Sequence, residues 1–342
     1  MAPAESGAEG ELNLSLELKE LLCTNLKKLG VLVYTCRINF NNVNQCRIVY
    51  FLYSFSWLNN RAARMEHPPL KPFLRWAGSK RKLIPALMPY WSGEYARYIE
   101  PFMGSASYFF ATEPNSAILS DQNECLVNAF NVIKHHPRRL YNQLAKLPRG
   151  EAAFYEVRAA YSPNLPKIIR ATYFIYLNRF CFNGLYRTNK SGKFNVPYGA
   201  TKSGDIPPLE HFYDVSKRLS VASIECNDYW TVMEQATSGD FIYIDPPYII
   251  PNKRVFSEYG AKVFDWNDFK RLVALLDVLD QRGVKFLLSY ADSSEAVELL
   301  SKWSISYSSA YRTMSGNAKS RKKESELIVT NIKLEEKKYA VG

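Results

Sequence analysis

The chain has 342 residues, of which 47% are hydrophobic and 23% charged, and its formal net charge is +11. This composition is typical of a globular protein, long enough for one large α/β domain with an insertion or for two domains. The excess of basic residues favours an anionic partner, nucleic acid first and an acidic membrane second. Six cysteines without a C-x-x-C pair, and only four histidines, argue against a structural zinc site or a disulfide framework and for free thiols in a reducing cytoplasm.

Residues 1 to about 64 differ in character from the rest of the chain. They begin acidic and become rich in cysteine and aromatic residues around residues 31–57. The longest apolar run, residues 48–58, is too short to span a bilayer, and the acidic start is unlike a signal peptide. A short amphipathic helix is predicted over residues 16–29. We expect this segment to carry no chemistry, and Met65 is a candidate for the native start.

A first block of interest begins at Lys71. Gly78-Ser79-Lys80 stands before a predicted apolar helix that contains Leu83 and Met88. Backbone N–H groups and a positive charge at a helix start suit an anion, although the glycine and lysine spacing is not that of a P-loop.

A second block resembles the start of a nucleotide-binding βαβ unit. A predicted strand reaches Glu100 and Phe102, a turn of small residues follows, and a helix is predicted to begin near Ser107. Small residues allow the backbone to close around a ligand. The next predicted strand ends in Asp121, 21 residues after Glu100, close to the spacing at which such a unit places a carboxylate on a ribose hydroxyl. Two acids that merely cap helices are the alternative.

Helices are predicted over residues 122–146, broken near Pro137, and over residues 152–161. Residues 167–204 then contain seven basic residues, eight aromatic residues and no acid. The part up to Phe180 is predicted to be helical, with its aromatic residues in the core and Asn183-Gly184 as its left-handed termination. Residues 185–189 and 193–198 are predicted to form a hairpin. Basic charge for phosphates and rings for stacking favour nucleic-acid contact.

The last third continues the alternation of strands and helices. A helix is predicted over residues 211–219, and strands over 222–226 and 241–244. Helices over 266–279 and 294–303 then alternate with strands over 284–290, 304–311 and 326–332. The final two strands should pair antiparallel across a basic loop at residues 315–323, which is either a phosphate contact or a solvated turn.

The strand at residues 241–244 ends in Asp245-Pro246-Pro247-Tyr248. The prolines prevent the strand from continuing, so the acid lies at a strand end, where ligands bind in open α/β sheets; a plain turn is the alternative. An adenine or cytosine amino group is a poor nucleophile, because its lone pair is delocalised into the ring. Asp245 can accept one of its N–H groups and the Pro246 carbonyl the other, while Tyr248 stacks on the base. This chemistry requires no metal.

Together these blocks resemble the Dam-type DNA adenine-N6 methyltransferases with the α order of motifs. The resemblance is carried by Trp76-Ala77-Gly78-Ser79-Lys80, by residues 101–107, by residues 177–189 and 194–199, and by residues 245–248, and it extends from Lys71 to Ile332. It implies an α/β fold: a Rossmann-like methyltransferase sheet, mostly parallel with a C-terminal antiparallel strand. This domain is predicted at residues 65–165 and 222–333, with an inserted helical and β-hairpin DNA-recognition domain at 166–221, an N-terminal segment at 1–64 and a tail at 334–342.

The resemblance also implies roles for individual residues. Contacts to S-adenosylmethionine are implied for Trp76, Lys80, Phe102, Gly104, Ser105 and Asp121. Catalysis on an adenine flipped out of double-stranded DNA is implied for Asp245, Pro246, Pro247 and Tyr248. Insertion into the duplex or reading of a GATC target is implied for Arg75, Phe182, Asn183, Leu185, Arg187, Asn189 and Pro197. The expected protein is a monomer without metal or membrane contact, in the cytoplasm of a bacterium at the nucleoid, or phage-encoded.

Three residues depart from the pattern of this family. Ala106 replaces the usual last glycine of the cofactor loop, Phe182 a common tyrosine and Arg75 a lysine. The alternatives are an amino-methyltransferase acting on cytosine N4, RNA or a protein glutamine, and a DNA-binding homologue with impaired catalysis. The sequence leaves open whether the enzyme serves a restriction-modification system or acts alone.

Overall fold

The computed structural model describes residues 69–189, 191–249, 264–311 and 323–334. The chain divides into two units, Met1–Met65 and Glu66–Gly342, and all described residues lie in the second. The predicted helix at residues 16–29, the candidate start at Met65 and most of the basic loop at 315–323 therefore lie outside the described residues.

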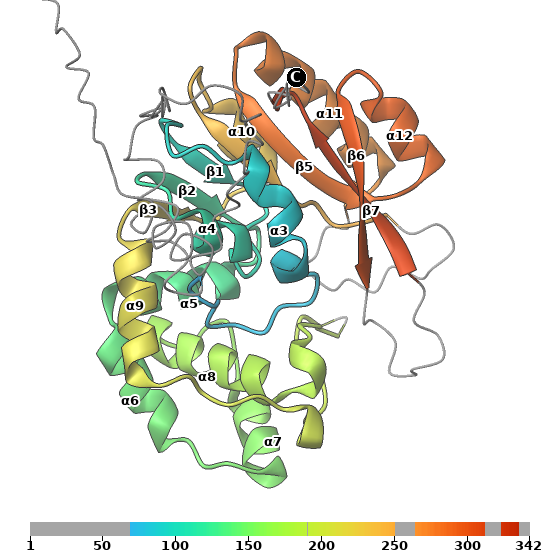
Figure 1. The fold of residues 1–342 in the computed structure, drawn as a ribbon. Helices are drawn as coiled ribbons and strands as arrows, with labels where there is room; N and C mark the ends of the chain where they lie inside the picture. Colours follow the sequence, from blue (N-terminus) through green and yellow to red (C-terminus); the bar gives the residue numbers. More distant parts are fainter. Residues whose placement is uncertain (1–68, 190, 250–263, 312–322, 335–342) are drawn as a thin grey trace, which may run out of the picture. The chain divides into compact units, whose positions relative to one another are not determined.

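A seven-stranded sheet with the order β3-β2-β1-β4-β5-β7-β6 forms the centre of the second unit (Figure 1). The strands are β1 (Tyr98–Glu100), β2 (Ala117–Ser120), β3 (Ala222–Glu225), β4 (Phe241–Ile244), β5 (Lys285–Ala291), β6 (Ser304–Tyr311) and β7 (Lys323–Thr330). The pairs from β3 to β5 are parallel, whereas β7 is antiparallel to both β5 and β6. This arrangement confirms the predicted mostly parallel sheet with a C-terminal antiparallel strand.

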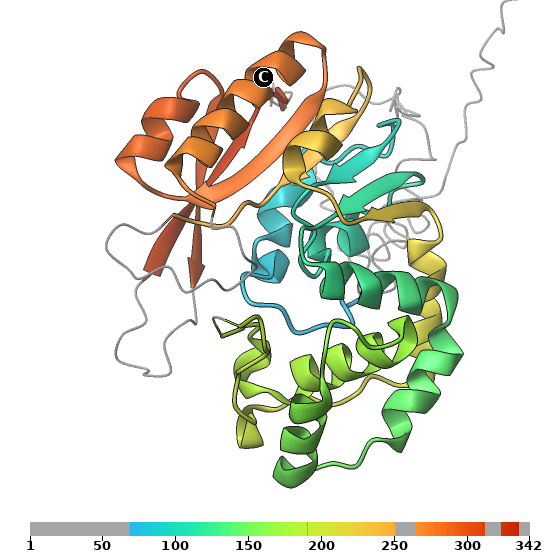
Figure 2. The ribbon, with the colours of Figure 1, turned by 180° about the vertical axis from the view of Figure 1, so that it is seen from behind.

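Helices cover both faces of the sheet (Figures 1 and 2). One face packs on α10 (Tyr229–Glu234), α11 (Trp266–Gln281) and α12 (Ser294–Leu300). The buried cluster on the other face includes α4 (Ser107–Thr112) and α5 (Glu124–His135). It continues through α9 (Leu209–Leu219) and α8 (Lys167–Phe180) to α6 (Pro137–Lys146) and α7 (Glu151–Ala160), which lie away from the sheet. Successive side chains of a strand point to opposite faces of the sheet, as β4 shows. Ile242 and Ile244 point to the face covered by α10, α11 and α12, and Phe241 and Tyr243 point to the other face.

The predicted apolar helix after Lys80 is confirmed in part, as a short α-helix between two 3-10 turns. The three elements are η1 (Lys80–Lys82), α3 (Ile84–Leu87) and η2 (Met88–Tyr90). Pro85 and Pro89 each lie in the first turn of a new element, because proline has no N–H to continue the hydrogen bonds of the previous one.

The predicted helix termination at Asn183-Gly184 is wrong. Helix α8 ends at Phe180 with an extended Cys181, and the left-handed residues Asn183 (φ 55°) and Gly184 (φ 66°) belong to a separate turn, η3 (Phe182–Gly184). A short 3-10 turn, η4 (Ala200–Lys202), follows the hairpin.

The hairpin that follows α8 is confirmed as an antiparallel pairing, but as isolated bridges rather than continuous strands. The bridges join Cys181 to Tyr198 and Thr188 to Phe194. At its tip the Asn189 N–H donates to the Lys193 carbonyl at 2.9 Å. Among the described cysteines, Cys125, Cys181 and Cys226 are free thiols, as predicted. No helix in the described parts of the chain is long and apolar enough to cross a membrane.

Candidate active site

Three acids lie at the carboxyl ends of neighbouring parallel strands. Glu100 ends β1, Asp121 follows β2 and Asp245 follows β4. Carboxyl ends of parallel strands meet at one edge of the sheet, where ligands of open α/β folds bind. Glu100 lies between the other two, because β1 lies between β2 and β4 in the sheet. The residues predicted to bind the cofactor and those predicted to act on the base therefore share one edge.

Asp121 is held by the backbone. Its Oδ2 accepts the Gly104 N–H at 3.2 Å and its Oδ1 the Asn123 N–H at 2.9 Å. Burial raises the pKa of Asp121 to about 6, although the two hydrogen bonds act to lower it. Gly104 has φ 45°, and a Cβ on it would approach Trp76 Cδ1 to 3.0 Å. The loop thus closes tightly between the carboxylate and the indole.

The rest of the cofactor loop is also ordered by its own side chains. The hydroxyl oxygens of Ser105 and Ser107 are 2.9 Å apart, and Ser79 lies 2.8 Å from Ser107. The Phe102 ring stacks on Tyr229 with centroids 5.4 Å apart. Ala106 is fully buried and left-handed (φ 52°, ψ 36°), which is the conformation that explains the glycine common at this position in the family.

Asp245 has partners that the sequence did not reveal. Its Oδ1 lies 3.1 Å from the Lys80 amine and accepts a hydrogen bond from Ser289 Oγ at 3.2 Å. Burial raises the pKa of the Asp245 carboxyl, while Lys80 and Ser289 act to lower it. The same amine is 3.9 Å from Glu326 Oε1. Lys80, predicted to contact the cofactor, therefore directs its charge to the predicted catalytic acid.

The aromatic residue of the motif lies beside this ion pair. The Lys80 amine is 4.6 Å from the Tyr248 ring centroid, and the Tyr248 ring meets Tyr290 edge-on with centroids 5.1 Å apart. The segment leaves the sheet at the edge that carries the acids, because it follows the end of β4 at Ile244. Pro246 is buried, and Pro247 and Tyr248 are half-buried.

The residues predicted to contact DNA lie on and beside the hairpin. Three of them are exposed, namely Asn183, Asn189 and Pro197. Three more are half-buried, namely Phe182, Leu185 and Arg187. Arg187 Nε donates to Asn195 Oδ1 at 2.8 Å, which fixes its side chain along the hairpin. Arg75, the seventh predicted contact, donates from Nη1 to the Arg179 carbonyl at 3.1 Å.

Asn178, a buried residue of α8, fastens the N-terminal block to the hairpin. Its Oδ1 accepts the Arg75 N–H at 2.9 Å, and its Nδ2 donates to the Arg75 carbonyl at 2.6 Å and to the Gly184 carbonyl at 3.3 Å. Trp76 stacks on Tyr186 of the hairpin, with centroids 5.7 Å apart, and contacts the cofactor loop at Gly104. The three blocks of the site are thus in direct contact.

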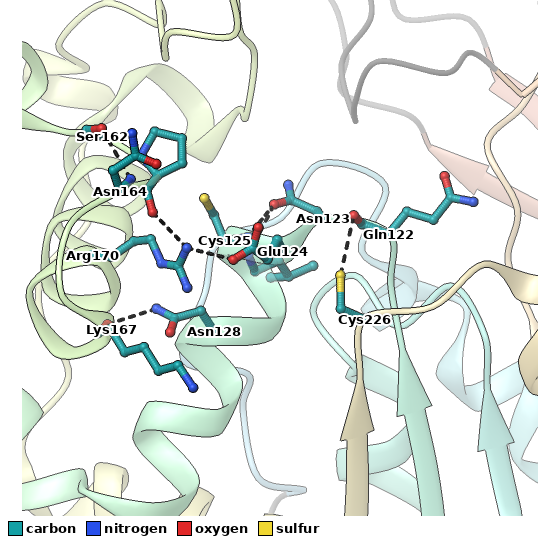
Figure 3. Close-up of polar contacts among 12 residues, drawn as sticks. Gln122, Asn123, Glu124, Cys125, Asn128, Ser162, Asn164, Lys167, Arg170 and Cys226 are labelled. Atoms are coloured by element: carbon teal, nitrogen blue, oxygen red, sulfur yellow. Dashed lines mark hydrogen bonds and ion pairs between the residues drawn. The ribbon is translucent and has the colours of Figure 1, made fainter.

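A second set of contacts joins the sheet edge to α8 (Figure 3). The Asn123 side chain caps α5 by accepting the N–H groups of Cys125 and Leu126, both at 3.1 Å. The next residue, Glu124, pairs with Arg170 of α8 at 2.7 Å. Helix α8, which leads into the hairpin, is therefore tied to the residues that follow Asp121.

Comparison with known proteins identifies this arrangement. Residues 76–314 match the family model of the D12 class N6 adenine-specific DNA methyltransferases. The chain belongs to this family. Membership confirms the predicted resemblance and implies DNA as the substrate and S-adenosylmethionine as the methyl donor. Membership in an adenine-specific DNA methyltransferase family argues against cytosine N4, RNA and protein as the substrate. In the described ranges, no group of three or more His, Cys, Asp or Glu could hold a metal ion.

Individual relatives of this D12 methyltransferase cover most of the chain. The type II methyltransferase M1.LlaDCHI of Lactococcus lactis subsp. cremoris is 34% identical over 271 residues, 77% of this chain and 95% of the relative. The DNA adenine methylase of Vibrio cholerae is 31% identical over 269 residues, 75% of this chain and 95% of the relative. The DNA N-6-adenine-methyltransferase of Escherichia phage P1 is 32% identical over 236 residues, 67% of this chain and 31% of the relative.

Proposed function

We propose that this D12 methyltransferase acts as a monomer on double-stranded DNA and methylates N6 of an adenine that it flips out of the duplex, with GATC as the target. The observation that carries the proposal is the placement of Asp121 and Asp245 at one edge of the sheet, with the recognition hairpin fastened beside them. The enzyme would act beside DNA in the cytoplasm of a bacterium or of a phage-infected cell.

The cofactor residues fit S-adenosylmethionine. Asp121 presents a carboxylate, held by two N–H groups, to the ribose hydroxyls. Gly104 and Ser105 bring the backbone close to the ligand, and Phe102 and Trp76 supply apolar rings. When bound, the cofactor supplies an electrophilic methyl group on a positively charged sulfur.

The catalytic segment acts on the exocyclic amino group. Asp245 and the Pro246 carbonyl accept its two hydrogens and so direct its lone pair at the methyl group, while Pro247 keeps the segment extended and Tyr248 faces the base. With S-adenosylmethionine bound, N6 would take the methyl group while the electron pair of the broken C–S bond stays on sulfur, and N6 would then release one proton to solvent. Flipping is required because the amino group of a stacked base is out of reach.

Recognition is assigned to the hairpin and the N-terminal block. Arginine reads guanine through two hydrogen bonds, a role that Arg187 and Arg75 can fill, and Asn183, Asn189, Phe182, Leu185 and Pro197 surround the duplex. The GATC target is supported by the resemblance of the hairpin and by the name DNA adenine methylase of the Vibrio relative.

A single experiment tests reaction, base and target. The chain is expressed in a host that lacks adenine methylation, and modified bases are mapped by sequencing. We expect N6-methyladenine in GATC from the native chain and none from Asp245→Ala, whose DNA binding persists. Methylation in another sequence would overturn the target, and full activity of Asp245→Ala would remove Asp245 from the mechanism.

A further inference from the structure

We propose that Lys80 and Ser289 are positioning residues that keep the Asp245 carboxylate ionised, occupy its Oδ1 and leave its Oδ2 to accept hydrogen from the adenine amino group, and that Glu326 positions Lys80 and opposes its charge. The proposal rests on the proposed function, in which Asp245 is that acceptor. It assigns Lys80 to the catalytic acid rather than to the cofactor, and it adds two residues that belong to none of the motifs.

The contacts of Asp245 are unevenly divided between its two oxygens. The Lys80 amine, at 3.1 Å, and Ser289 Oγ, at 3.2 Å, both bind Oδ1. No residue in the described part of the chain donates a hydrogen bond to Oδ2. Two partners on one oxygen fix the rotation of the carboxylate, so the orientation of the acceptor is set before the base arrives.

The direction of the hydrogen bonds follows from the ionised carboxylate. Because it can only accept, the Ser289 hydroxyl must donate to it. The Tyr243 hydroxyl, 3.1 Å from Ser289 Oγ, then donates to Ser289. Tyr243 and Ser289 are both completely or almost completely buried. The pair is thus a fixed donor chain that runs from β4 through β5 to Oδ1.

Lys80 lies between two carboxylates. Its amine is 3.1 Å from Asp245 and 3.9 Å from Glu326, and the side chains of Lys80 and Glu326 are 8% and 5% exposed. The Asp245 side chain is 19% exposed, the most of the three. Glu326 therefore contacts Lys80 in the buried part of the site, while the exposed part of the Asp245 carboxylate remains accessible to the substrate.

The charged and titratable groups that face Asp245 within the described residues enter this balance. Lys80 from η1 favours the ionised form, and Glu326 from β7 disfavours it. Burial raises the pKa of Glu100 from β1 well above the usual value. Tyr243 from β4 carries a hydroxyl group whose pKa is also raised by burial. Among the described residues, Lys80 and Glu326 thus act on the charge of Asp245 with opposite signs.

The opposite signs give a test that a purely structural role would fail. The rate of single-turnover methyl transfer is measured against pH with Lys80→Met and Glu326→Gln. A cation at this distance lowers a carboxyl pKa by about 1–3 units, so Lys80→Met should move the acidic limb of the profile to higher pH by about that amount. Glu326→Gln should move it to lower pH. The double variant should return it toward the native position.

Controls separate this proposal from the proposed function. Lys80→Arg keeps the charge and should keep the native limb, while cofactor affinity should be unchanged in Lys80→Met. Ser289→Ala should lower kcat without moving KM for DNA, because it frees the carboxylate to rotate. Thermal unfolding of each variant checks that it is folded. An inactive Asp245→Asn together with unshifted limbs in Lys80→Met and Glu326→Gln would overturn the positioning role alone. An active Asp245→Asn would remove the ionised acceptor from the mechanism, whereas a native chain without methyl transfer would overturn the proposed function itself.

Discussion

At the scale of a single residue, the proposed role of Asp121 predicts that cofactor binding depends on pH. Its pKa is raised to about 6 by burial, and in the proposed function the ribose hydroxyls donate to its ionised form. Affinity for S-adenosylmethionine should therefore be constant above about pH 7 and fall as pH is lowered through about 6. Asp121→Asn should bind about 10–100-fold more weakly at pH 8 and lose this dependence, measured by calorimetric titration.

Glu100 provides the matched control for Asp121. It lies on the adjacent strand, its Oε2 accepts the Tyr98 hydroxyl at 2.8 Å, and its pKa lies well above the usual range through burial. Because burial favours its uncharged form, Glu100→Gln should change cofactor affinity little and keep the decline near pH 6. A decline that survives in Asp121→Asn would show that another group titrates.

Glu113 lies in a conformation that suits glycine. It follows α4, is exposed and has φ 50°, with its N–H bonded to the Phe109 carbonyl. A left-handed residue with a side chain costs about 1–2 kcal/mol, so Glu113→Gly should raise the free energy of unfolding by about 1 kcal/mol in urea titrations.

A substitution of Ala106, at the other end of α4, distinguishes the effect of backbone strain from the effect of packing on stability. It is also left-handed, at φ 52°, but fully buried. Ala106→Gly relieves similar strain and loses a buried methyl group worth about 0.8 kcal/mol, so its gain should be smaller than that of Glu113→Gly. Destabilisation by Glu113→Gly would contradict the assignment of strain to the backbone.

At the scale of elements, the sequence correctly predicted the helices and strands that are determined by a local pattern of residues. The strands before Asp121 and Asp245 and the break of the helix at Pro137 follow from apolar runs and proline, and the structure has them. Helix α10 was missed because its six residues are too few for a periodic pattern. The helix after Lys80 is shorter than its apolar spacing suggests, because Pro85 and Pro89 each start a new short element.

The partners of the site could not be predicted in the same way. Asp121 and Asp245 are marked by their place after a strand, whereas Lys80, Ser289 and Glu326 reach Asp245 from η1, β5 and β7. Which side chains meet there depends on the order of strands in the sheet, which brings β5 beside β4 and β7 beside β5. A single sequence contains no local signal for such long-range pairs.

The hairpin contains two left-handed glycines with different surroundings. A Cβ on Gly184 (φ 66°) would lie 2.4 Å from Arg75 Cβ and 2.8 Å from the Arg75 carbonyl oxygen, while a Cβ on Gly192 (φ 74°) meets nothing within 4 Å. Gly184→Ala should therefore cost about 2–5 kcal/mol of stability and displace Arg75 from the hairpin, which relaxes target choice. Denaturation and methylation mapping measure the two effects.

Gly192→Ala is the control within the same hairpin. It carries only the cost of its left-handed backbone, about 1 kcal/mol, and should leave target choice unchanged. Equal effects of the two substitutions would show that the close approach to Arg75 does not position the hairpin.

At the scale of the whole molecule, the sheet shares one buried core with α8 and the hairpin. The same buried cluster contains Tyr98 and Phe241 of the sheet, Phe174 of α8 and Phe194 of the hairpin. Such continuity favours a single cooperative unfolding transition for the described unit, rather than separate unfolding of an inserted domain.

Phe174 tests this cooperativity, because it lies in α8 far from the opposite face of the sheet. Its ring is 2% exposed and lies 5.5 Å from Tyr186, and Phe174→Ala should cost about 3–5 kcal/mol. Trp303 reports on that opposite face, where it packs on Phe286, and fluorotryptophan labelling with NMR separates its signal from those of the other five tryptophans. With one shared core, the Trp303 signal and far-UV circular dichroism should shift to the same lower urea midpoint in this variant. A midpoint for Trp303 that stays native while the circular dichroism shifts would mean that α8 and the hairpin unfold separately from the sheet.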